Sequence, residues 1–391
     1  MDRENVKLVD VLQEKGYIRG PFGSALKRGD MKDSGIPVYE QQHAIYNNRN
    51  FRYFVDDEKF NDMQRFQVKT NDLIISCSGT VGKVSIINEK DPKGIISQAL
   101  LILRADTTKI LPEYLRYFFT SREGYNAIVS RSSGSVQVNI AKRDVIEHIP
   151  LKLPSIFLQK KIVDILGNID KKIKTNEEIN ENLLEQAQAI FAHAFPYTPS
   201  DILPKGWRLG TVGEIIEIHD SKRIPLSGAQ RDKMKKKIYP YYGAASLMDY
   251  VDEYIFDGKY LLLGEDGTVV DNAGFPILQY VWGQFWVNNH AHILTGKLGY
   301  SVESLYILFK QTTVKSIVTG AVQPKISQAN LKSIAVVIPP ANLIESFNKQ
   351  VDAMFTLIRN NSEENKRLAA LRDGLLPKLM SGELDVSNLD I

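Results

Sequence analysis

The sequence contains a single cysteine, Cys77, in 391 residues. One thiol excludes an internal disulfide framework and a cysteine-based zinc finger, and it is typical of a reducing compartment, so we expect a cytoplasmic protein. Long hydrophobic runs are also missing. Runs such as those at residues 260–263 and 334–338 are far shorter than the roughly 18 residues of a membrane helix. The N-terminal residues lack the apolar run of a signal peptide, and we expect no contact with a membrane.

An excess of charge of one sign is absent as well. The 49 Lys and Arg residues nearly balance the 46 Asp and Glu residues, which gives a formal net charge of +3. The total charge therefore does not predict a nucleic-acid-binding protein, and only local basic clusters can support that function. A hydrophobic content of 43% in a chain of this length is enough for two or three domains, each with its own core.

Motifs that would indicate an enzyme are missing. No Gly-x-Gly occurs, which excludes the dinucleotide fingerprint and the usual glycine loop of an S-adenosylmethionine site. Residues 78–83 are similar to a phosphate-binding loop, but Cys77 replaces its first glycine and Val84 replaces the residue that holds magnesium. A β-turn is the better interpretation. The Pro-Pro pair at 339–340 lacks the preceding Asn or Asp of amino-methyltransferases, and we expect no catalytic residue.

Two histidines are candidate metal ligands. His290 and His292 would lie on one face of a strand, where both could bind one ion. The sequence suggests no third ligand, and the matching positions of the internal repeat described next are Gln98 and Leu100. We therefore favour structural or DNA-contacting histidines and predict no metal site.

The chain contains an internal repeat. Gly-Ser-Val-Gln at 134–137, followed by Ile140, recurs as Gly-Ala-Val-Gln at 320–323, followed by Ile326. Weaker matches keep the same order along the chain; they pair residues 75–81 with 263–269, and Glu113 with Glu303. Chance similarity between two apolar stretches is the alternative, but the conserved order of the matches argues against it.

A long amphipathic segment follows each copy of the repeat. Its apolar residues recur at spacings of three and four, which is typical of one helix face, and asparagines interrupt both copies at the same place. The predicted seam comprises Ile162, Leu166, Ile169, Ile173, Asn176 and Asn180 in the first copy and Phe347, Val351, Met354, Ile358, Asn361 and Asn365 in the second. A helix packed only on its own domain is the alternative. The length of about 40 residues favours two helices that pair as an antiparallel coiled coil.

The rest of each copy predicts a mixed globule. Short β-rich runs are expected at residues 72–76, 84–87, 99–103, 260–263 and 334–338, and short helices at 112–119 and 302–309. The predicted fold class is α+β, with two mixed α/β domains, two long helices and an internal pseudo-twofold repeat. The predicted boundaries are 1–154 for the first domain, 155–197 for the first helix, 198–340 for the second domain, and 341–391 for the second helix and tail.

Basic residues cluster in one segment of the second copy. Seven basic residues and one acidic residue lie between Lys222 and Lys237. Such a cluster neutralises phosphates and makes binding depend on salt. In the first copy, basic residues between Arg19 and Arg52 alternate with Gln, Asn and His, a mixture that can contact bases as well as phosphates. A solvated polar loop has a similar composition, so both interpretations stay open.

The chain resembles the DNA specificity subunits of type I restriction-modification systems. The resemblance rests on the two-copy plan, on Leu-Lys-Leu-Pro at 151–154 before the first long helix, and on Gly-Leu-Leu-Pro-Lys-Leu-Met-Ser-Gly-Glu-Leu at 374–384. It implies two target recognition domains, each reading one half of an asymmetric bipartite site in double-stranded DNA. It also implies that the helices act as a spacer and dock two methyltransferase subunits, together with restriction or translocase subunits.

The resemblance further implies a non-catalytic chain without a cofactor of its own. S-adenosylmethionine, ATP and Mg²⁺ are expected on the partner subunits. The second copy departs from the family pattern at Pro324 and at Gly-Glu-Asp 264–266, which replaces the Ser-Cys-Ser of the first copy. These changes affect local base contacts and leave the architecture intact.

The candidate DNA contacts lie on loops at residues 19–52, 79–83 and 131–137 and at 221–237, 265–272 and 320–325. The chosen residues are Arg19, Lys27, Arg28, Gln42, Arg49, Arg52, Thr80, Lys83, Arg131, Ser133, Gln137, Lys222, Arg223, Arg231, Lys235, Lys236, Lys237, Thr268, Gln323 and Lys325. Two other hypotheses stay open. One is a methyltransferase or nuclease with altered motifs; the other is a coiled-coil scaffold that carries tandem protein- or ligand-binding domains without DNA specificity.

Overall fold

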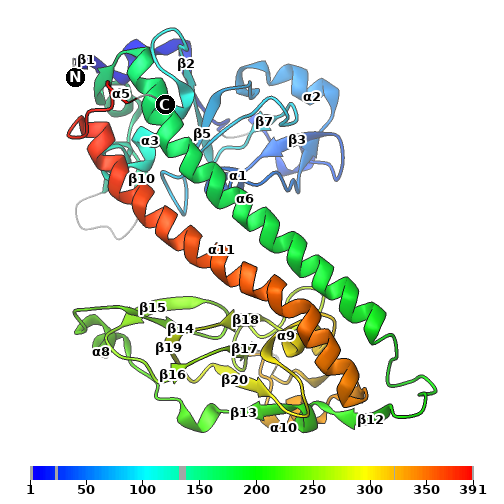
Figure 1. The fold of residues 1–391 in the computed structure, drawn as a ribbon. Helices are drawn as coiled ribbons and strands as arrows, with labels where there is room; N and C mark the ends of the chain where they lie inside the picture. The colour runs from blue at the N-terminus through cyan, green and yellow to red at the C-terminus, as the bar shows by residue number, and fades with distance from the viewer. Residues whose placement is uncertain (1–2, 23–24, 132–137, 321, 390–391) are drawn as a thin grey trace. The chain divides into compact units, whose positions relative to one another are not determined.

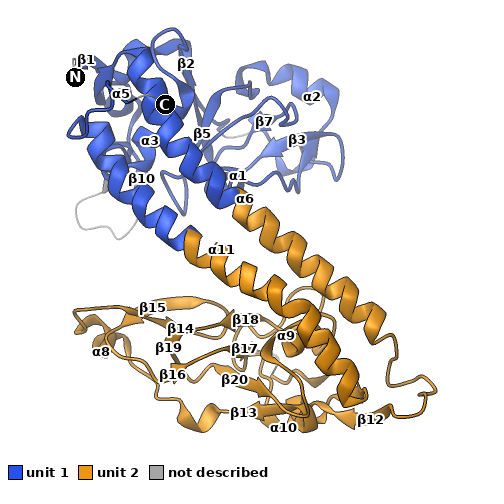
Figure 2. Ribbon diagram, in the orientation of Figure 1, with its two compact units in different colours: residues 1–174, 365–391 blue, residues 175–364 orange. Residues whose placement is uncertain are grey.

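The computed structural model describes residues 3–22, 25–131, 138–320 and 322–389. The chain forms two compact units (Figure 2). Unit 1 comprises residues 1–174 and 365–391, and unit 2 comprises residues 175–364. Each unit therefore contains one globular part and half of each long helix.

The core of unit 1 is a four-stranded antiparallel sheet with the order β2–β8–β5–β6 (Figure 1). The strands are β2 (Leu12–Arg19), β8 (Leu100–Ala105), β5 (Asp72–Ser76) and β6 (Val84–Ile86). All five residues of β5 are buried. Leu73 and Ile75 face the helices, whereas Ile74 packs with a second, smaller sheet. Burial on both faces explains why the three central residues of the strand, 73–75, are all apolar instead of alternating.

The remaining elements of unit 1 flank this sheet. The smaller sheet has the order β4–β3–β7, and two antiparallel pairs, β1–β11 and β9–β10, complete the strands. The strand bounds are β3 (Ile36–Tyr39), β4 (Phe54–Val55), β7 (Ile95–Ile96), β1 (Arg3–Lys7), β11 (Pro150–Pro154), β9 (Val129–Arg131) and β10 (Val138–Ile140). The helices are η1 (Leu8–Val11), η3 (Arg28–Asp30), α1 (Gln41–Ile45), α2 (Asp57–Asp62), η4 (Gln64–Phe66), α3 (Pro112–Thr120), α4 (Arg122–Ile128) and α5 (Arg143–Glu147).

Unit 2 repeats this topology. Its main sheet has the order β13–β20–β17–β18, formed by β13 (Ile216–Ile218), β20 (Ala291–Gly296), β17 (Tyr260–Gly264) and β18 (Leu278–Val281). The pairs β3–β7 and β14–β19 are both parallel, and β1–β11 and β12–β21 are both antiparallel. The matched strand order confirms the internal repeat.

The other elements of unit 2 complete its second sheet and its helices. The strands are β12 (Arg208–Thr211), β14 (Tyr239–Tyr242), β15 (Leu247–Val251), β16 (Phe256–Asp257), β19 (Gln284–Val287) and β21 (Ala335–Ile338). The helices are α7 (Val212–Ile215), η5 (Asp220–Lys222), α8 (Gly228–Asp232), α9 (Val302–Lys310), η6 (Lys315–Ile317) and α10 (Gln328–Ser333). The predicted short strands and the two predicted short helices are confirmed to within two residues at each end.

The two predicted long helices are α6 (Ile156–Ala194) and α11 (Ala341–Ser381). They run antiparallel within each unit. In unit 1, Asn365 Nδ2 donates to the Ile173 carbonyl at 3.2 Å. In unit 2, Asn361 Nδ2 donates to Asn180 Oδ1 at 2.9 Å, and Asn176 Nδ2 donates to a Glu364 carboxylate oxygen at 2.7 Å.

The predicted seam residues are buried or half-buried. In unit 1, Leu376 and Leu379 of α11 share a core with Ile162 and Leu166 of α6. The asparagines bond across the pair, as polar seam residues that fix register do. None of the described helices has the length and apolar character needed to span a bilayer.

Candidate nucleic-acid interface

In unit 1, the turn between β5 and β6 carries two of the candidate contacts. Ser76 Oγ donates to the Thr80 carbonyl at 2.6 Å and accepts from the Lys83 N–H at 3.0 Å. Gly79 and Gly82 have φ values of +58° and +81°, which glycine adopts without strain. A strand, and no helix, follows this turn. The β-turn interpretation is confirmed, and Thr80 and Lys83 are exposed on the turn.

Helix α1 lies against this turn and its hairpin. A Cβ placed on Gly79 would meet Gln41 Nε2 at 3.5 Å, and Ser85 Oγ donates to the His43 carbonyl at 3.0 Å. The predicted loop at 19–52 is not a continuous loop, because it contains β3 and α1. Its helix α1 and the predicted loop at 79–83 belong to one surface of unit 1. His43 itself is buried, and burial holds the pKa of its imidazole below the usual value.

The arginines of this surface differ in how exposed they are and in how fully their charge is paired. Arg49 lies 2.6 Å from Asp91 and donates to the Ile86 carbonyl at 3.0 Å, so its charge is already neutralised. Arg52 pairs with Glu40 at 2.7 Å but keeps 64% of its side chain exposed. Gln42 donates to the Asn50 carbonyl at 3.2 Å. Arg49 and Gln42 shape the loop, whereas Arg52 is on the surface.

Arg19 belongs to a separate basic cleft of about 320 Å³. Tyr17, Arg65, Lys142 and Arg143 also line the cleft. Arg143 pairs with Glu147 at 2.8 Å. No sequence pattern indicated Arg65, Lys142 and Arg143, because Arg65 is far along the chain from the adjacent pair Lys142 and Arg143.

The other candidates of unit 1 lie at the start of η3 or on the repeat motif. Lys27 and Arg28 are exposed, and the Lys27 N–H donates to Asp30 at 2.8 Å. Arg131 ends β9. Ser133 and Gln137 lie outside the described residues.

In unit 2, part of the predicted basic cluster is already neutralised. Arg223 lies 2.6 Å from Glu265, and both Arg231 and Lys237 lie 3.1 Å from Asp249. All five lysines of the cluster are exposed, namely Lys222, Lys233, Lys235, Lys236 and the ion-paired Lys237. The positive surface is therefore smaller than the sequence count predicts.

Asp252 shapes the end of the basic cluster. Its carboxylate accepts from the backbone N–H groups of Lys235, Lys236 and Lys237 at 3.1, 2.7 and 2.8 Å. The bond from Lys237 is the main reason that the pKa of Asp252 lies below its usual value. The carboxylate folds the backbone of this segment, while Lys235 and Lys236 remain exposed.

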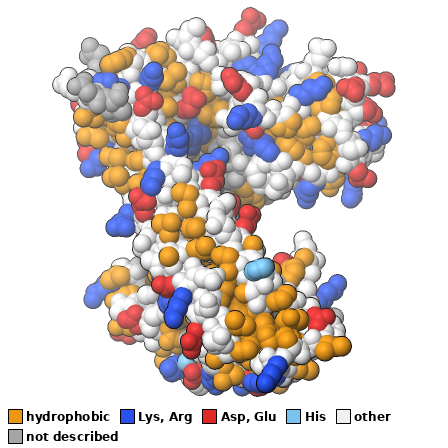
Figure 3. All heavy atoms as spheres, turned by 45° about the vertical axis from the view of Figure 1, so that its right-hand side comes forward, with side chains coloured by type: hydrophobic (Ala, Val, Ile, Leu, Met, Phe, Trp, Pro, Cys, Tyr) orange, Lys and Arg blue, Asp and Glu red, His pale blue; other side chains and the backbone are white. Residues whose placement is uncertain are grey.

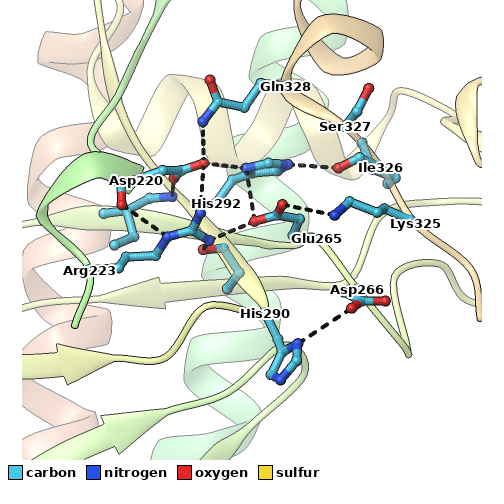
Figure 4. Close-up of polar contacts among 12 residues, drawn as sticks. Asp220, Arg223, Glu265, Asp266, His290, His292, Lys325, Ile326, Ser327 and Gln328 are labelled. Atoms are coloured by element: carbon cyan, nitrogen blue, oxygen red, sulfur yellow. Dashed lines mark hydrogen bonds and ion pairs between the residues drawn. The ribbon is translucent and has the colours of Figure 1, made fainter. Parts of the chain in front are cut away.

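A buried polar network lies at the end of the main sheet of unit 2 (Figure 4). His292 Nδ1 lies 2.6 Å from Asp220, and its Nε2 lies 2.8 Å from the Ile326 carbonyl. A carboxylate oxygen and a backbone carbonyl oxygen therefore face the two ring nitrogens of His292. Gln328 Nε2 donates to the same Asp220 oxygen at 2.7 Å. The network thus joins η5, β20 and the segment before α10.

Glu265 completes the network through two cations. It lies 2.6 Å from Arg223 and 3.5 Å from Lys325. Burial alone would raise the pKa of Asp220, but the bond from His292 and the Ile293 N–H hold it below its usual value. Both carboxylates therefore face cationic side chains.

One sequence expectation about the histidines was wrong. His290 does not share a strand face with His292, because β20 begins at Ala291; its ring lies 3.6 Å from Asp266 instead. The sequence suggested no third ligand, but the folded chain brings two carboxylates to His292. Ligand atoms of Asp220, Glu265 and His292 lie within 4.8 Å of one another. Arg223 and Lys325 already supply positive charge there, so the cluster is held together by ion pairs.

The sequence signal for this network was the difference between the two copies. Glu265 stands where the first copy has Cys77. His292 stands where the first copy has Leu101, and not at the position of Leu100 that the sequence repeat predicts, because Leu263 pairs with His292 as its counterpart Ile75 pairs with Leu101. Both residues of the first copy are buried. Ionisable residues at positions that are apolar in the other copy need partners, but the sequence does not identify Asp220 and Arg223 as those partners.

The remaining candidates of unit 2 are near this network. Thr268 and Gln323 are exposed, and the Lys325 side chain is half exposed beside Glu265. On the face in view in Figure 3, the described Lys and Arg side chains alternate with Asp and Glu, and hydrophobic side chains gather on part of unit 2. Any electrostatic interface on this face is therefore made of small basic groups.

Comparison with known proteins identifies the family. Residues 4–185 and 204–372 each match the model of the type I restriction modification DNA specificity domain. The chain therefore belongs to the family of type I restriction-modification DNA specificity subunits, with two copies of the domain as the repeat predicts. Specificity subunits are the non-catalytic, DNA-binding members of these systems.

Several relatives extend over most of the chain. It is 24% identical over 310 residues to the MjaIX type I restriction enzyme specificity subunit of Methanocaldococcus jannaschii, covering 72% of this chain and 71% of that protein. It is 21% identical over 363 residues to the putative MjaX specificity subunit of the same organism, covering 85% and 83%. The crystal structure of an S subunit from M. genitalium has a similar fold, with a TM-score of 0.57, 16% identity, and coverage of 98% and 96%.

Proposed function

We propose that this chain selects an asymmetric bipartite site in double-stranded DNA, with one half-site for each unit. The observation that carries this proposal is that the two units share their strand framework but differ in the loops at the ends of their main sheets. The two units share their strand order, yet the ends of their main sheets carry different side chains. A shared framework with different exposed loops favours two readers with different specificities, because base contacts depend on individual side chains.

We also propose that the long helices form an antiparallel coiled coil that spaces the readers. Helix α6 has 39 residues and is about 58 Å long at 1.5 Å per residue. Major grooves face the same side of a duplex about every 34 Å. A stiff helix pair therefore selects a gap length without reading the bases inside it.

Buried polar contacts support a rigid attachment of each reader to its helices. In unit 1, Asp170 of α6 accepts from Tyr117 Oη at 2.7 Å and pairs with Arg116 at 3.1 Å. In unit 2, Glu303 of α9 lies 3.2 Å from Arg359 of α11 and accepts from Tyr280 Oη at 2.7 Å. Such contacts fix the orientation of a helix on its globule.

The catalytic chemistry belongs to the partners in this proposal. Two methyltransferase subunits dock on the helices, and restriction or translocase subunits join them. S-adenosylmethionine, ATP and Mg²⁺ are bound by those subunits. The twofold character of the repeat supports two equivalent docking surfaces from a single chain.

Methylation mapping tests the proposed function directly. The host expresses a cognate methyltransferase with or without this chain, and methylated motifs are mapped across the genome. We expect a split, asymmetric motif that is absent without this chain. A palindromic or unsplit motif would contradict the two-reader proposal.

Binding by the purified complex separates the remaining hypotheses. We expect affinity for the mapped duplex to fall steeply as salt increases. No salt-dependent binding would favour the scaffold hypothesis. Methyl transfer by the isolated chain would favour the enzyme hypothesis.

A further inference from the structure

A hairpin in unit 2 presents an apolar and an amide side chain to solvent. Thr319 and Lys325 exchange backbone hydrogen bonds of 2.9 and 2.7 Å at its base. Val322 is fully exposed, and Gln323 beside it is exposed as well. Neither side chain supports the core of the unit.

A single exposed valine needs no explanation, but this one belongs to a repeated motif. Val-Gln at 322–323 matches Val-Gln at 136–137 in the first copy, although the latter pair lies outside the described residues. Most other candidate contact positions differ between the copies. A pair that is the same in both copies and is exposed at Val322 points to a contact with something common to both halves.

The base of the hairpin is anchored to the buried network (Figure 4). The Gly267 N–H donates to the Pro324 carbonyl at 3.0 Å, and the Ile326 N–H donates to the Glu265 carbonyl at 2.9 Å. His292 contacts the Ile326 carbonyl, and Lys325 pairs with Glu265. The network thus holds both the hairpin and the neighbouring loop that carries Thr268.

Such a network is better suited to positioning than to stability. The side chains of Asp220 and His292 are 4% and 0% exposed. Buried ion pairs often add little net stability over apolar residues, and in some proteins they specify one arrangement instead. In the first copy, the apolar and buried Leu101 occupies the position of His292.

We propose that Val322 and Gln323 contact DNA at features that do not depend on the half-site sequence, and that Asp220 and His292 are positioning residues for this contact. The proposal rests on the proposed function. A residue pair shared by two readers cannot distinguish their half-sites, so it adds affinity and not specificity. The Gln amide suits phosphate oxygens or the minor-groove acceptors present at every base pair, and the Val methyl groups suit the sugar edge.

The direct test truncates the side chains of Val322 and Gln323, which we call the tip of the hairpin. The complex with Val322→Ala and Gln323→Ala is titrated with the mapped duplex and with a duplex whose second half-site is scrambled. We expect both affinities to fall by about the same factor, on the order of tenfold for one lost contact. Ile202→Ala is the matched control, because Ile202 is 97% exposed elsewhere in unit 2, and it should leave both affinities unchanged.

Three results would overturn the proposal. Unchanged affinity for both duplexes would show that the tip does not contact DNA. A loss confined to the mapped duplex would make the tip a base reader. Normal DNA affinity with failed methyltransferase assembly would make it a protein contact. If the unaltered complex does not bind the mapped duplex at all, the proposed function itself fails, which the wild-type titration reveals before any variant is made.

The positioning role is tested by combining variants. Asp220→Asn keeps the shape of the side chain and removes its charge, and His292→Gln is a second, independent variant. We expect each to weaken binding of both duplexes, and neither to weaken binding further once the tip is removed. Fully additive losses would overturn the positioning role, since they would show that the network acts without the tip. Hydrogen exchange of β17 and β20 confirms that each variant is folded.

Discussion

The two units have the same strand order in their main sheets but different side chains at the end of that sheet. Unit 1 closes the end of its main sheet with Cys77 and Leu101, which are buried. Burial raises the pKa of the Cys77 thiol to about 12, so the thiol stays neutral. Unit 2 places Glu265 and His292 at the corresponding positions and pairs them with Asp220 and Arg223. Strand order is thus maintained by apolar cores in both units, while the sheet end is free to diverge.

The polar contacts that attach each globule to its long helices also differ between the units, in the exposure of their carboxylates. Removing these carboxylates gives the largest expected loss of stability. Glu303 is 4% exposed, whereas Asp170 is 28% exposed. Glu303→Ala leaves Lys259 and Arg359 without their buried acid, which costs about 3–5 kcal/mol. Asp170→Ala should cost less, because water reaches the site. Hydrogen exchange of β17 and β5 measures the two units separately, and equal losses would contradict this ranking.

The helix seam should give an intermediate effect. Ile169→Ser and Met354→Ser each place a hydroxyl in a half-buried apolar position of α6 or α11, with an expected loss of about 2 kcal/mol in the unit that contains the residue. Ile179→Ser is the control, because Ile179 is 39% exposed on α6. If all three variants are equally stable, the seam is wrongly placed.

Acid should affect unit 2 through its buried carboxylates. Burial would raise the pKa of Glu303, but bonds from Lys259 and Tyr280 hold it below its usual value, as bonds from His292 and Ile293 do for Asp220. A lowered folded-state pKa means that stability is present above the unfolded value and is lost as the pH falls through the folded value. We expect unit 2 to lose stability progressively below about pH 4.5, the usual glutamate range.

One carboxylate of unit 1 has a pKa shifted in the opposite direction, so acid has the opposite effect on its contribution to stability. Burial raises the pKa of Asp72 despite its ion pair with Arg104, so protonation of Asp72 on acidification relieves part of its burial cost. Hydrogen exchange followed from pH 7 to pH 3 compares the two main sheets. Greater loss in β5 than in β17 would contradict the assigned directions.

The smallest predicted effect is on the salt dependence of DNA binding. Lys235→Ala with Lys236→Ala removes two exposed charges, and the slope of log affinity against log salt should fall by up to about 1.8. Lys237→Ala is the matched control, because Lys237 is paired with Asp249 and should change the slope less. An unchanged slope in the double variant would place the phosphate contacts elsewhere.

The strands and helices that have a local or periodic sequence signal could be predicted from the sequence. The short apolar run within residues 72–76 and the three-four spacing around Ile162 and Met354 are properties of one strand or one helix face, so these elements were predictable. The sequence did not predict which basic side chains are free of ion pairs and which are neutralised. Arg49 and Arg223 have the same composition signal as Arg52 and Lys222, and only their folded neighbours Asp91 and Glu265 neutralise them.

The sequence by itself determined the two-copy plan, the long helices and the family, because repeats, periodicity and motifs are written along the chain. Only the tertiary structure decided which basic residues are exposed, which cleft collects Arg19 with Arg65 and Arg143, and how Asp220 meets His292. These are contacts between segments that lie tens of residues apart, and no local pattern records them. Their energies depend on distance and burial, which exist only in the folded chain.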